Sequence, residues 1–501
     1  MTDSILGVSD LIAAAAGETC ADGYRRIAVT EVEWQALARG CAEGRHDLLA
    51  LWVDGKRVRI ALRDPGTSLR AIVSLDCAGD RYPAIGCFHA PAIRLERAMR
   101  DLYGCVPDGL ADDRPWLDHG VGPAFGNSSA QGQFYRFLPA EGEGLHQIPV
   151  GPVHAGIIEP GHFRFTANGE TIVRLEQRFG YTHKGVEALL AGGAIDKAAR
   201  LAARISGDST VAYSFAFARA VESICGVEIP QRARLLRGIM AELERISHHI
   251  SDFGAICNDA SVVTINAHCA LLRERLLQMA DRCFGHRLMM DRIVPGGVVR
   301  DLADDDARAL RHLLEETAAS FANTVRVYDE SPSLLDRTVS TGIVTKDLAR
   351  RFAAGGFVGR ASGRDFDSRR DAAYTPYDSL SFTVPTRQRG DVDARAWIRA
   401  EETAASIDMI LHMLDRLVPG PIRAGSLTPQ PGEAAALVEA FRGDVFVTVR
   451  LDEQGEVAHC HARDPSWFQW PLLEAAIEGN IVADFPLCNK SFNCSYSGPD
   501  L

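Results

Sequence analysis

The sequence predicts an α+β protein: an N-terminal α/β module followed by a mainly helical domain with small β hairpins. Strand-like runs joined by hairpin dipeptides gather in the first 140 residues. Apolar residues at helical spacing dominate from about 185 to 328 and return from 394 to 417. A chain of 501 residues is long enough for two domains, which we place at 1–140 and 141–501.

The N-terminal module begins with three predicted strands. Asp54-Gly55, a strong two-residue hairpin signal, separates runs 48–53 and 57–62. Run 71–75 is the third. Two further predictions follow along the chain: a helix over 91–103, which places Ile93, Leu95, Met99 and Leu102 roughly on one face, and a linker rich in Gly, Pro and Asp over 104–122.

The second domain combines hairpins with long helices. Asn168-Gly169 predicts a turn between strands at 163–166 and 171–175. Pro230 occupies a first-turn position, and an apolar stripe follows it: Leu235, Leu236, Ile239, Leu243, Ile246 and Ile250. The run 394–417 predicts another helix, which ends before Pro419-Gly-Pro421. Runs 445–451 and 456–461 predict a third hairpin.

Composition excludes several classes of function. The net charge of −12 argues against binding to nucleic acid, which needs a basic surface. No apolar run approaches the roughly 20 residues that span a bilayer. Leu11 to Ala16 is too short and too poorly flanked for a signal peptide. We therefore expect a cytoplasmic protein that reaches a membrane only through a complex.

Two short segments carry the most informative chemistry. Arg204-Ile-Ser206-Gly-Asp-Ser209 and Cys488-Asn-Lys-Ser491 keep the spacing of paired metal-binding cysteines, but three of the four ligand positions are serines. A serine hydroxyl stays protonated near neutral pH and is a poor ligand for a soft metal. The 12 cysteines form no Cys-x-x-Cys pair, and reduced structural thiols are the expectation for most of them. The pattern indicates a redox-enzyme scaffold that has lost its metal site.

The N-terminal module carries a first family signature. Glu96-Arg97-Ala-Met-Arg-Asp101-Leu-Tyr-Gly104, followed by Asp113-Arg114-Pro115-Trp116, resembles the C-type (30 kDa) subunit of respiratory complex I. Taken alone, the charged cluster also suits a solvated helix end followed by a turn.

The rest of the chain resembles the large subunit of energy-converting nickel-iron hydrogenases, of the hydrogenase-3 and hydrogenase-4 type, and their relative, the D-type (49 kDa) subunit of complex I. The matching segments occur in the family's order over about 350 residues. They are Gly151-Pro-Val-His154-Ala-Gly-Ile-Ile-Glu159-Pro-Gly-His162, Tyr181-Thr-His183-Lys-Gly185-Val-Glu187, Ala241-Glu-Leu-Glu-Arg245-Ile-Ser-His248-His249, Pro295-Gly-Gly-Val-Val-Arg-Asp301, Arg360-Ala-Ser-Gly363, Asp367, Arg369, Tyr374 to Asp378, and Gly390-Asp-Val-Asp-Ala-Arg395. The resemblance implies a fused C/D-type subunit.

The resemblance also assigns candidate roles. Active hydrogenases carry Arg-x-Cys-Gly-x-Cys where this chain has Ser206 and Ser209, and Cys-x-x-Cys where it has Cys488 and Ser491. This implies a degenerate site that holds no metal. Glu159 falls at the family's proton-relay position, and it and His154 are the candidate acid-base residues. The alternative for Glu159 is a surface or helix-capping carboxylate. The quinone-contacting tyrosine of complex I falls near Gly207, so that contact is missing.

Other polar residues have both pocket and structural interpretations. His183 and the pair His248-His249 are either pocket residues or structural histidines. Arg360 and Asp367 suggest a buried ion pair in the cavity wall. His459-Cys460-His461 places two imidazoles on one strand face without further matched ligands, so we expect an exposed strand.

The resemblance implies how such a subunit works. It would bind no cofactor itself and would face a [4Fe-4S] cluster held by a small subunit like the B-type subunit of complex I. Antiporter-like membrane subunits would be further partners at the inner membrane, with quinone as a potential acceptor. No nucleotide-binding Gly-x-Gly-x-x-Gly begins a βαβ unit. Two alternatives remain: a true nickel-iron hydrogenase subunit and a non-redox scaffold.

Overall fold

The computed structural model describes residues 20–77, 79–120, 135–154 and 158–501. Its mixture of helices and small sheets confirms the predicted α+β class. The segment weighed as a signal peptide and the last two residues of the predicted linker lie outside these ranges. Within the described part, no helix is long and apolar enough to cross a membrane.

The N-terminal module is built on a four-stranded sheet in the order β1-β4-β3-β2. Its strands are β1 (Arg25–Ala28), β2 (Asp47–Asp54), β3 (Arg57–Arg63) and β4 (Arg70–Asp76). β1 pairs parallel with β4, and the other pairs are antiparallel. The predicted Asp54-Gly55 turn is confirmed, because Asp54 pairs with Arg57 across it. Residues Trp34 of α2 (Glu31–Ala42) and Leu95 of α3 (Ile93–Tyr103) pack into its core. A short parallel pair, β5 (Arg81–Pro83) and β6 (Val106–Asp108), and η1 (Ala90–Ala92) complete the module.

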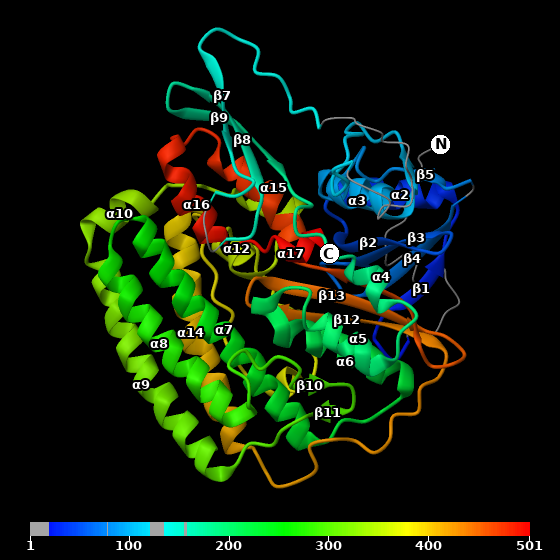
Figure 1. Ribbon diagram of the computed structural model, residues 1–501, viewed down its shortest axis with the longest axis vertical. Helices are drawn as coiled ribbons and strands as arrows, with labels where there is room; N and C mark the ends of the chain where they lie inside the picture. Colours follow the sequence, from blue (N-terminus) through cyan, green and yellow to red (C-terminus); the bar gives the residue numbers. More distant parts are fainter. Residues whose placement is uncertain (1–19, 78, 121–134, 155–157) are drawn as a thin grey trace.

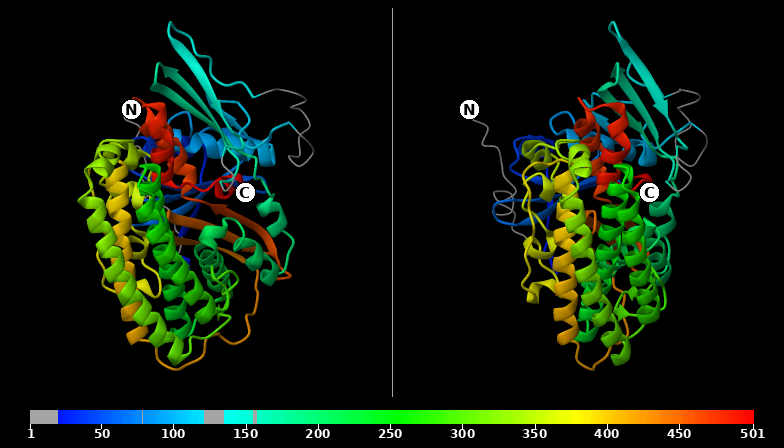
Figure 2. Two further views of the ribbon diagram at one scale, coloured as in Figure 1. Left: turned by 60° about the vertical axis from the view of Figure 1, so that its left-hand side comes forward. Right: turned by 90° about the vertical axis from the view of Figure 1, so that its left-hand side faces the viewer.

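The second part is organised around four long helices. They are α7 (Gln231–Asp259), α8 (Val263–Phe284), α9 (Asp304–Asp329) and α14 (Val392–Asp415). The apolar stripe predicted after Pro230 is buried in their core, which confirms the helical spacing. Figures 1 and 2 show these helices running alongside one another as a bundle.

A second sheet lies between the bundle and the N-terminal module (Figure 1). It consists of β12 (Gly432–Ala440), β13 (Gly443–Leu451) and β14 (Val457–Arg463), all antiparallel. The predicted third hairpin corresponds to β13 and β14, whereas β12 was not predicted. Helix α6 (Thr210–Cys225) packs against β12 and β13. The tight β12–β13 turn, residues 440–443, lies in the protein interior, because all four of its residues are buried.

A third sheet projects from the body (Figure 2) and contains β7 (Leu145–Val150), β8 (His162–Asn168) and β9 (Thr171–Arg178). The predicted Asn168-Gly169 hairpin is confirmed. The remaining elements are β10 (Ile293–Val294), β11 (Gly297–Val298), α4 (Val186–Leu190), α5 (Ile195–Ala202), η3 (Gly207–Ser209), α10 (Pro332–Thr338), α11 (Lys346–Arg351), α12 (Gly356–Ala361), α13 (Ser368–Asp371), η4 (Tyr377–Ser379), α15 (Ser466–Ile477), η5 (Val482–Asp484), α16 (Phe485–Phe492) and α17 (Ser497–Asp500).

The two parts of the chain share a hydrophobic core. Trp34 and Leu51 of the N-terminal module belong to the same buried cluster as Phe165, Trp467 and Phe492. The expectation of an exposed strand at His459-Cys460-His461 was wrong, because β14 is enclosed. Trp52 of β2 stacks on His461 with ring centroids 5.5 Å apart. The division at residue 140 stays a prediction, because sharing a core does not say whether either part folds alone.

Candidate functional site

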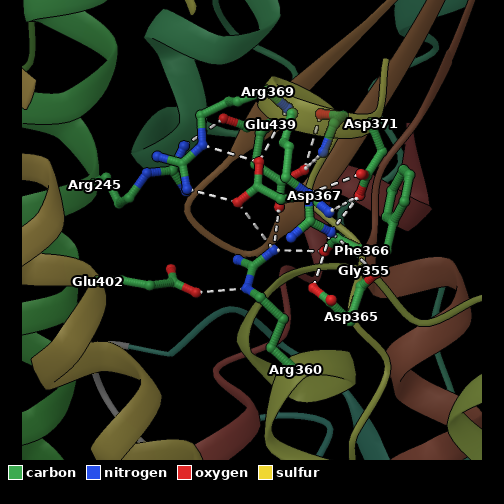
Figure 3. A network of polar contacts seen from close by, with 12 residues as sticks. Arg245, Gly355, Arg360, Asp365, Phe366, Asp367, Arg369, Asp371, Glu402 and Glu439 are labelled. Atoms are coloured by element: carbon green, nitrogen blue, oxygen red, sulfur yellow. Dashed lines mark hydrogen bonds and ion pairs between the residues drawn. The ribbon is translucent and has the colours of Figure 1, made fainter. Parts of the chain in front are cut away.

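Two clusters of polar residues lie next to each other at the β12–β13 turn. Arg442 of the turn belongs to one cluster, and Glu439 at the end of β12 belongs to the other. We call the first the serine–arginine site; it comprises Ser206, Asp208, Ser209, Arg442 and Ser495. We call the second the arginine network; it comprises Arg360, Asp367, Arg369, Glu402 and Glu439 (Figure 3), together with Glu242 and Arg245 of α7. Helix α7 contacts both clusters.

Arg442 is the centre of the serine–arginine site. Its guanidinium donates to both carboxylate oxygens of Asp208, at 2.8 and 2.5 Å, and lies 3.4 Å from the Ser209 hydroxyl. Its Nε also donates to the carbonyl oxygen of Asn493. Burial alone would raise the pKa of Asp208, but the neighbouring Arg442 guanidinium outweighs it and holds that pKa well below its usual range.

Ser206 connects η3 to the C-terminal segment. Its hydroxyl donates to Asp208 at 2.8 Å and lies 2.9 Å from the hydroxyl of Ser495. Ser495 is fixed in turn, because its backbone N–H donates to Ser466 and its hydroxyl accepts from the N–H of Gly498. Gly207 is exposed, and a side chain placed there would meet no atom within 4 Å. The site therefore reaches the protein surface at Gly207.

The predicted partners Cys488 and Ser491 make different contacts. The Ser491 hydroxyl donates to the carbonyl of Cys488 at 2.6 Å and accepts from Arg395 Nε at 2.9 Å. Burial raises the pKa of the Cys488 thiol to about 11. Among the described contacts, no hydrogen bond joins either residue to Ser206 or Ser209. The structure pairs Ser206 with Ser495 instead.

The candidate acid-base residues lie beside the C-terminal segment. The exposed Glu159 accepts a hydrogen bond from the backbone N–H of Ser497 at 2.9 Å, at the start of α17. The His154 ring lies near Phe163 and Tyr496, with centroids 5.4 and 6.5 Å apart, and burial lowers its pKa. Glu159 and His154 thus approach the same C-terminal segment as Ser495.

The other predicted histidines make structural contacts. His183 Nδ1 lies 2.6 Å from the carbonyl oxygen of Asp500. His248 stacks on Phe441, with centroids 4.5 Å apart, and burial lowers its pKa to about 4. His249 Nε2 lies 2.8 Å from Glu402 in the bundle core. These contacts favour the structural interpretation of all three.

The arginine network contains the predicted Arg360–Asp367 ion pair, at 3.3 Å, with both side chains buried. Arg360 also binds Glu402 at 2.6 Å and Glu439 at 2.9 Å (Figure 3). Arg369 adds a bidentate pair with Asp367. Burial and the neighbouring Asp367 carboxylate raise the pKa of Glu439, whereas the Arg360 guanidinium opposes the shift.

Comparisons with known proteins identify the fold family. A family model described as "Respiratory-chain NADH dehydrogenase, 49 Kd subunit" matches residues 259–428 and 424–500, and one described as "Nickel-dependent hydrogenase" matches residues 184–258. Formate hydrogenlyase subunit 5 of Escherichia coli is 30% identical over 448 residues, covering 85% of this chain and 78% of the relative. The chain belongs to the energy-converting nickel-iron hydrogenase large-subunit family.

Further known proteins are similar to this chain. Hydrogenase-4 component G of Escherichia coli is 29% identical, with 86% of this chain and 78% of that protein covered. A D-type NADH-quinone oxidoreductase chain of Roseiflexus is 32% identical, with 68% and 94% covered. A solved chain from an archaeal membrane-bound sulfane sulfur reductase, a respiratory membrane complex, aligns with a TM-score of 0.68 at 26% identity, covering 73% of this chain and all of that chain.

The residues of this family member do not fit a nickel-iron centre. Alcohols replace thiolates at Ser206 and Ser209, and both hydroxyls already have hydrogen-bond partners. The guanidinium of Arg442 lies 3.4 Å from the Ser209 hydroxyl and pairs with Asp208, so a guanidinium–carboxylate pair stands where a divalent metal would have to bind. Throughout the described segments, no group of three or more His, Cys, Asp or Glu side chains is arranged to hold a metal.

Sequence reasoning missed Asp208, Arg442 and Ser495. Anchoring the C-terminal motif on the Cys488-x-x-Ser491 spacing drew attention away from Cys494-Ser495-Tyr496-Ser497, a second run of small polar residues beside a cysteine. That run was the available signal for Ser495. Nothing local marked Arg442, because its role depends on the β12–β13 turn entering the core.

Glu244 gives the site a pH-dependent neighbour. Its carboxyl group accepts from the backbone N–H groups of Val211 and Ala212, at 2.8 and 3.2 Å, two and three residues after Ser209. Burial raises its pKa from 4.5 to about 8, although both amides oppose the shift. The folded state therefore keeps a proton that the unfolded chain releases between pH 4.5 and 8, so the free energy of unfolding falls as pH rises through that window.

Replacing Glu244 by glutamine removes this dependence. We expect Glu244→Gln to match the wild type near pH 5 and to gain, relative to it, on the order of 3 kcal/mol by about pH 9. Denaturant unfolding of both proteins at a series of pH values measures the difference. Glu228→Gln, at an exposed position, is the control and should follow the wild type throughout. Parallel pH curves for wild type and Glu244→Gln would contradict the assigned proton.

Proposed function

We propose that this chain is the large subunit of a membrane-associated oxidoreductase of the hydrogenase-4 and complex I type that operates without a nickel-iron centre of its own. The family membership supports an inherited hydrogenase-type scaffold. The relatives are components of a formate hydrogenlyase, of hydrogenase-4 and of a respiratory membrane complex, which supports assembly of this chain into a membrane complex. The observation that carries the proposal is the contact of Arg442 with Asp208 and Ser209. It fills the inherited ligand position with a guanidinium and a carboxylate that neutralise each other.

In this proposal the exposed edge of the serine–arginine site at Gly207 faces a partner. A small subunit like the B-type subunit of complex I would present a [4Fe-4S] cluster there. The large subunit would form the wall of the cavity, and Glu159 and His154 would supply proton exchange beside Ser497 and Tyr496. Quinone is the acceptor we propose, and antiporter-like membrane subunits would couple the electron transfer to ion pumping at the inner membrane.

Metal analysis of the purified complex tests the absence of a nickel-iron centre. We expect iron in the amount required by iron–sulfur clusters, nickel below about one tenth of an equivalent per large subunit, and no infrared bands of iron-bound carbonyl or cyanide. Stoichiometric nickel together with such bands would instead identify a hydrogenase and refute the proposal.

Cluster reoxidation in the same complex tests the redox role. After reduction, cluster reoxidation should accelerate on addition of a quinone and should slow in Glu159→Gln. Glu170→Gln is a suitable control, because Glu170 is an exposed residue in the β8–β9 turn. A rate that is indifferent to quinone would favour a non-redox scaffold.

A further inference from the structure

A pair of cysteine thiols lies in contact within the N-terminal module, far from the sites described above. Cys77 follows β4, and Cys105 lies between α3 and β6. Their sulfur atoms are 3.7 Å apart, and both residues carry free thiols. Cys105 is buried, whereas Cys77 is partly accessible to solvent. A small diffusible reagent therefore approaches the pair from the side of Cys77, and the Cys105 sulfur is within contact distance of the Cys77 sulfur.

The surrounding backbone holds the two thiols together. The N–H of Cys77 donates to the carbonyl of Lys56 at 2.8 Å, which extends the β3–β4 pairing to this residue. Next to Cys105, the N–H of Val106 donates to the backbone carbonyl of Asp80 at 2.8 Å. Arg81 pairs with Val106 at the start of the β5–β6 ladder. Both cysteines are thus anchored by neighbouring strands, so their proximity does not depend on a free loop end.

We propose that Cys77 and Cys105 form a thiol-oxidation site that closes to an intrachain disulfide when the protein meets a hydroperoxide. The Cys77 thiolate attacks the peroxide oxygen: an S–O bond forms, the O–O bond breaks, and water leaves after protonation. The Cys105 sulfur then attacks Cys77, forming the S–S bond and breaking the S–O bond, and a second water leaves with the Cys105 proton. Two thiols lose two electrons, and one hydrogen peroxide becomes two waters.

The surroundings of the two cysteines indicate which of them attacks the oxidant and which kind of oxidant can approach. The hydrogen bond with Cys105 lowers the pKa of Cys77, whereas the same contact and burial raise the pKa of Cys105. Cys77 is the partly accessible member of the pair, so it is the attacking thiolate, and the buried Cys105 is the resolving thiol. Asp80 places negative charge near both thiols. A neutral hydroperoxide is accepted there, whereas an anionic disulfide such as oxidised glutathione is repelled.

Peptide mapping under non-reducing conditions tests the proposal on the full-length chain. Brief treatment with hydrogen peroxide should join the peptides containing Cys77 and Cys105, remove two alkylatable thiols per chain, and be reversed by dithiothreitol. The same concentration of oxidised glutathione should give less than about a tenth of this linkage. A sulfinic acid on Cys77, a disulfide to another cysteine, or no loss of the two thiols would overturn it.

Variants separate the pair from general thiol oxidation. Cys77→Ser and Cys105→Ser should each abolish the cross-linked peptide. Cys87→Ser should leave it unchanged, because Cys87 is the exposed thiol of the same module and its Sγ contacts only the carbonyl of Ala84 among the described hydrogen bonds. Should a serine variant fail to fold, the wild-type peptide map alone still decides the outcome.

Discussion

Replacing Arg360 by alanine is expected to lower the free energy of unfolding by about 3–5 kcal/mol. Arg360 is the shared cation of Asp367, Glu402 and Glu439, all of which are buried. Removing it leaves an excess of negative charge away from water. Glu402 and Glu439 lose charge-assisted hydrogen bonds, and Asp367 loses an ion-pair partner. Denaturant unfolding, followed by circular dichroism, measures the loss.

A matched exposed arginine provides the control. Arg308 pairs with Asp305 on α9, with both side chains largely in solvent. Arg308→Ala should change the free energy of unfolding by less than about 1 kcal/mol. Arg360→Lys should be intermediate, because an ammonium keeps the charge but cannot make the same planar set of contacts. Equal effects of the Arg360 and Arg308 substitutions would show that the arginine network does not stabilise the fold.

Replacing Arg442 by methionine should cost about 2–4 kcal/mol and should loosen the serine–arginine site. Arg442 joins three distant segments, at Asp208, at the β12–β13 turn and at Asn493. Methionine preserves much of the side-chain volume but none of the hydrogen bonds. The loss of stability therefore measures the contribution of the guanidinium. Hydrogen exchange of residues 206–212 and 493–498 should accelerate, and the unfolding midpoint should fall.

A double-mutant cycle with Asp208→Asn isolates the ion pair. Asp208 is about one third exposed, so Asp208→Asn alone should cost clearly less than Arg442→Met. The carboxylate contributes stability above its unfolded pKa, and this contribution is lost as pH falls through the depressed folded pKa. The wild type should therefore lose its advantage over Asp208→Asn in strong acid. Additive effects of the two substitutions at neutral pH would refute the coupling.

The elements that could be predicted are those with strong local signals. The dipeptides Asp54-Gly55 and Asn168-Gly169 marked two hairpins, and the stripe after Pro230 marked α7. Strand β12 was missed because its sequence, Gly-Glu-Ala-Ala-Ala-Leu-Val-Glu-Ala, has the composition of a helix. Pairing with β13 and burial under α6 determine its conformation, and neither is visible in the local sequence.

The candidate site was predictable only where a local sequence motif marked its residues. The replacement of thiolates at Ser206 and Ser209 follows from the resemblance of this segment to the hydrogenase motif. The Arg360–Asp367 ion pair was also expected and is present. The contacts of Ser206 with Ser495 and of Arg442 with Asp208 join residues more than 200 positions apart. Such contacts depend on the assembled fold, and a spacing argument cannot supply them.

The shared core of the two parts has a consequence for biosynthesis. Arg26 binds Glu433, and Arg463 donates to the carbonyl of Leu49, so the earliest strands contact residues made more than 400 positions later. Trp34 and Leu51 likewise lie in one cluster with Trp467. While the ribosome is still translating, the nascent N-terminal sheet leaves part of its apolar surface open to water. We therefore expect the nascent chain to be sensitive to aggregation until the residues around 433–467 have been made.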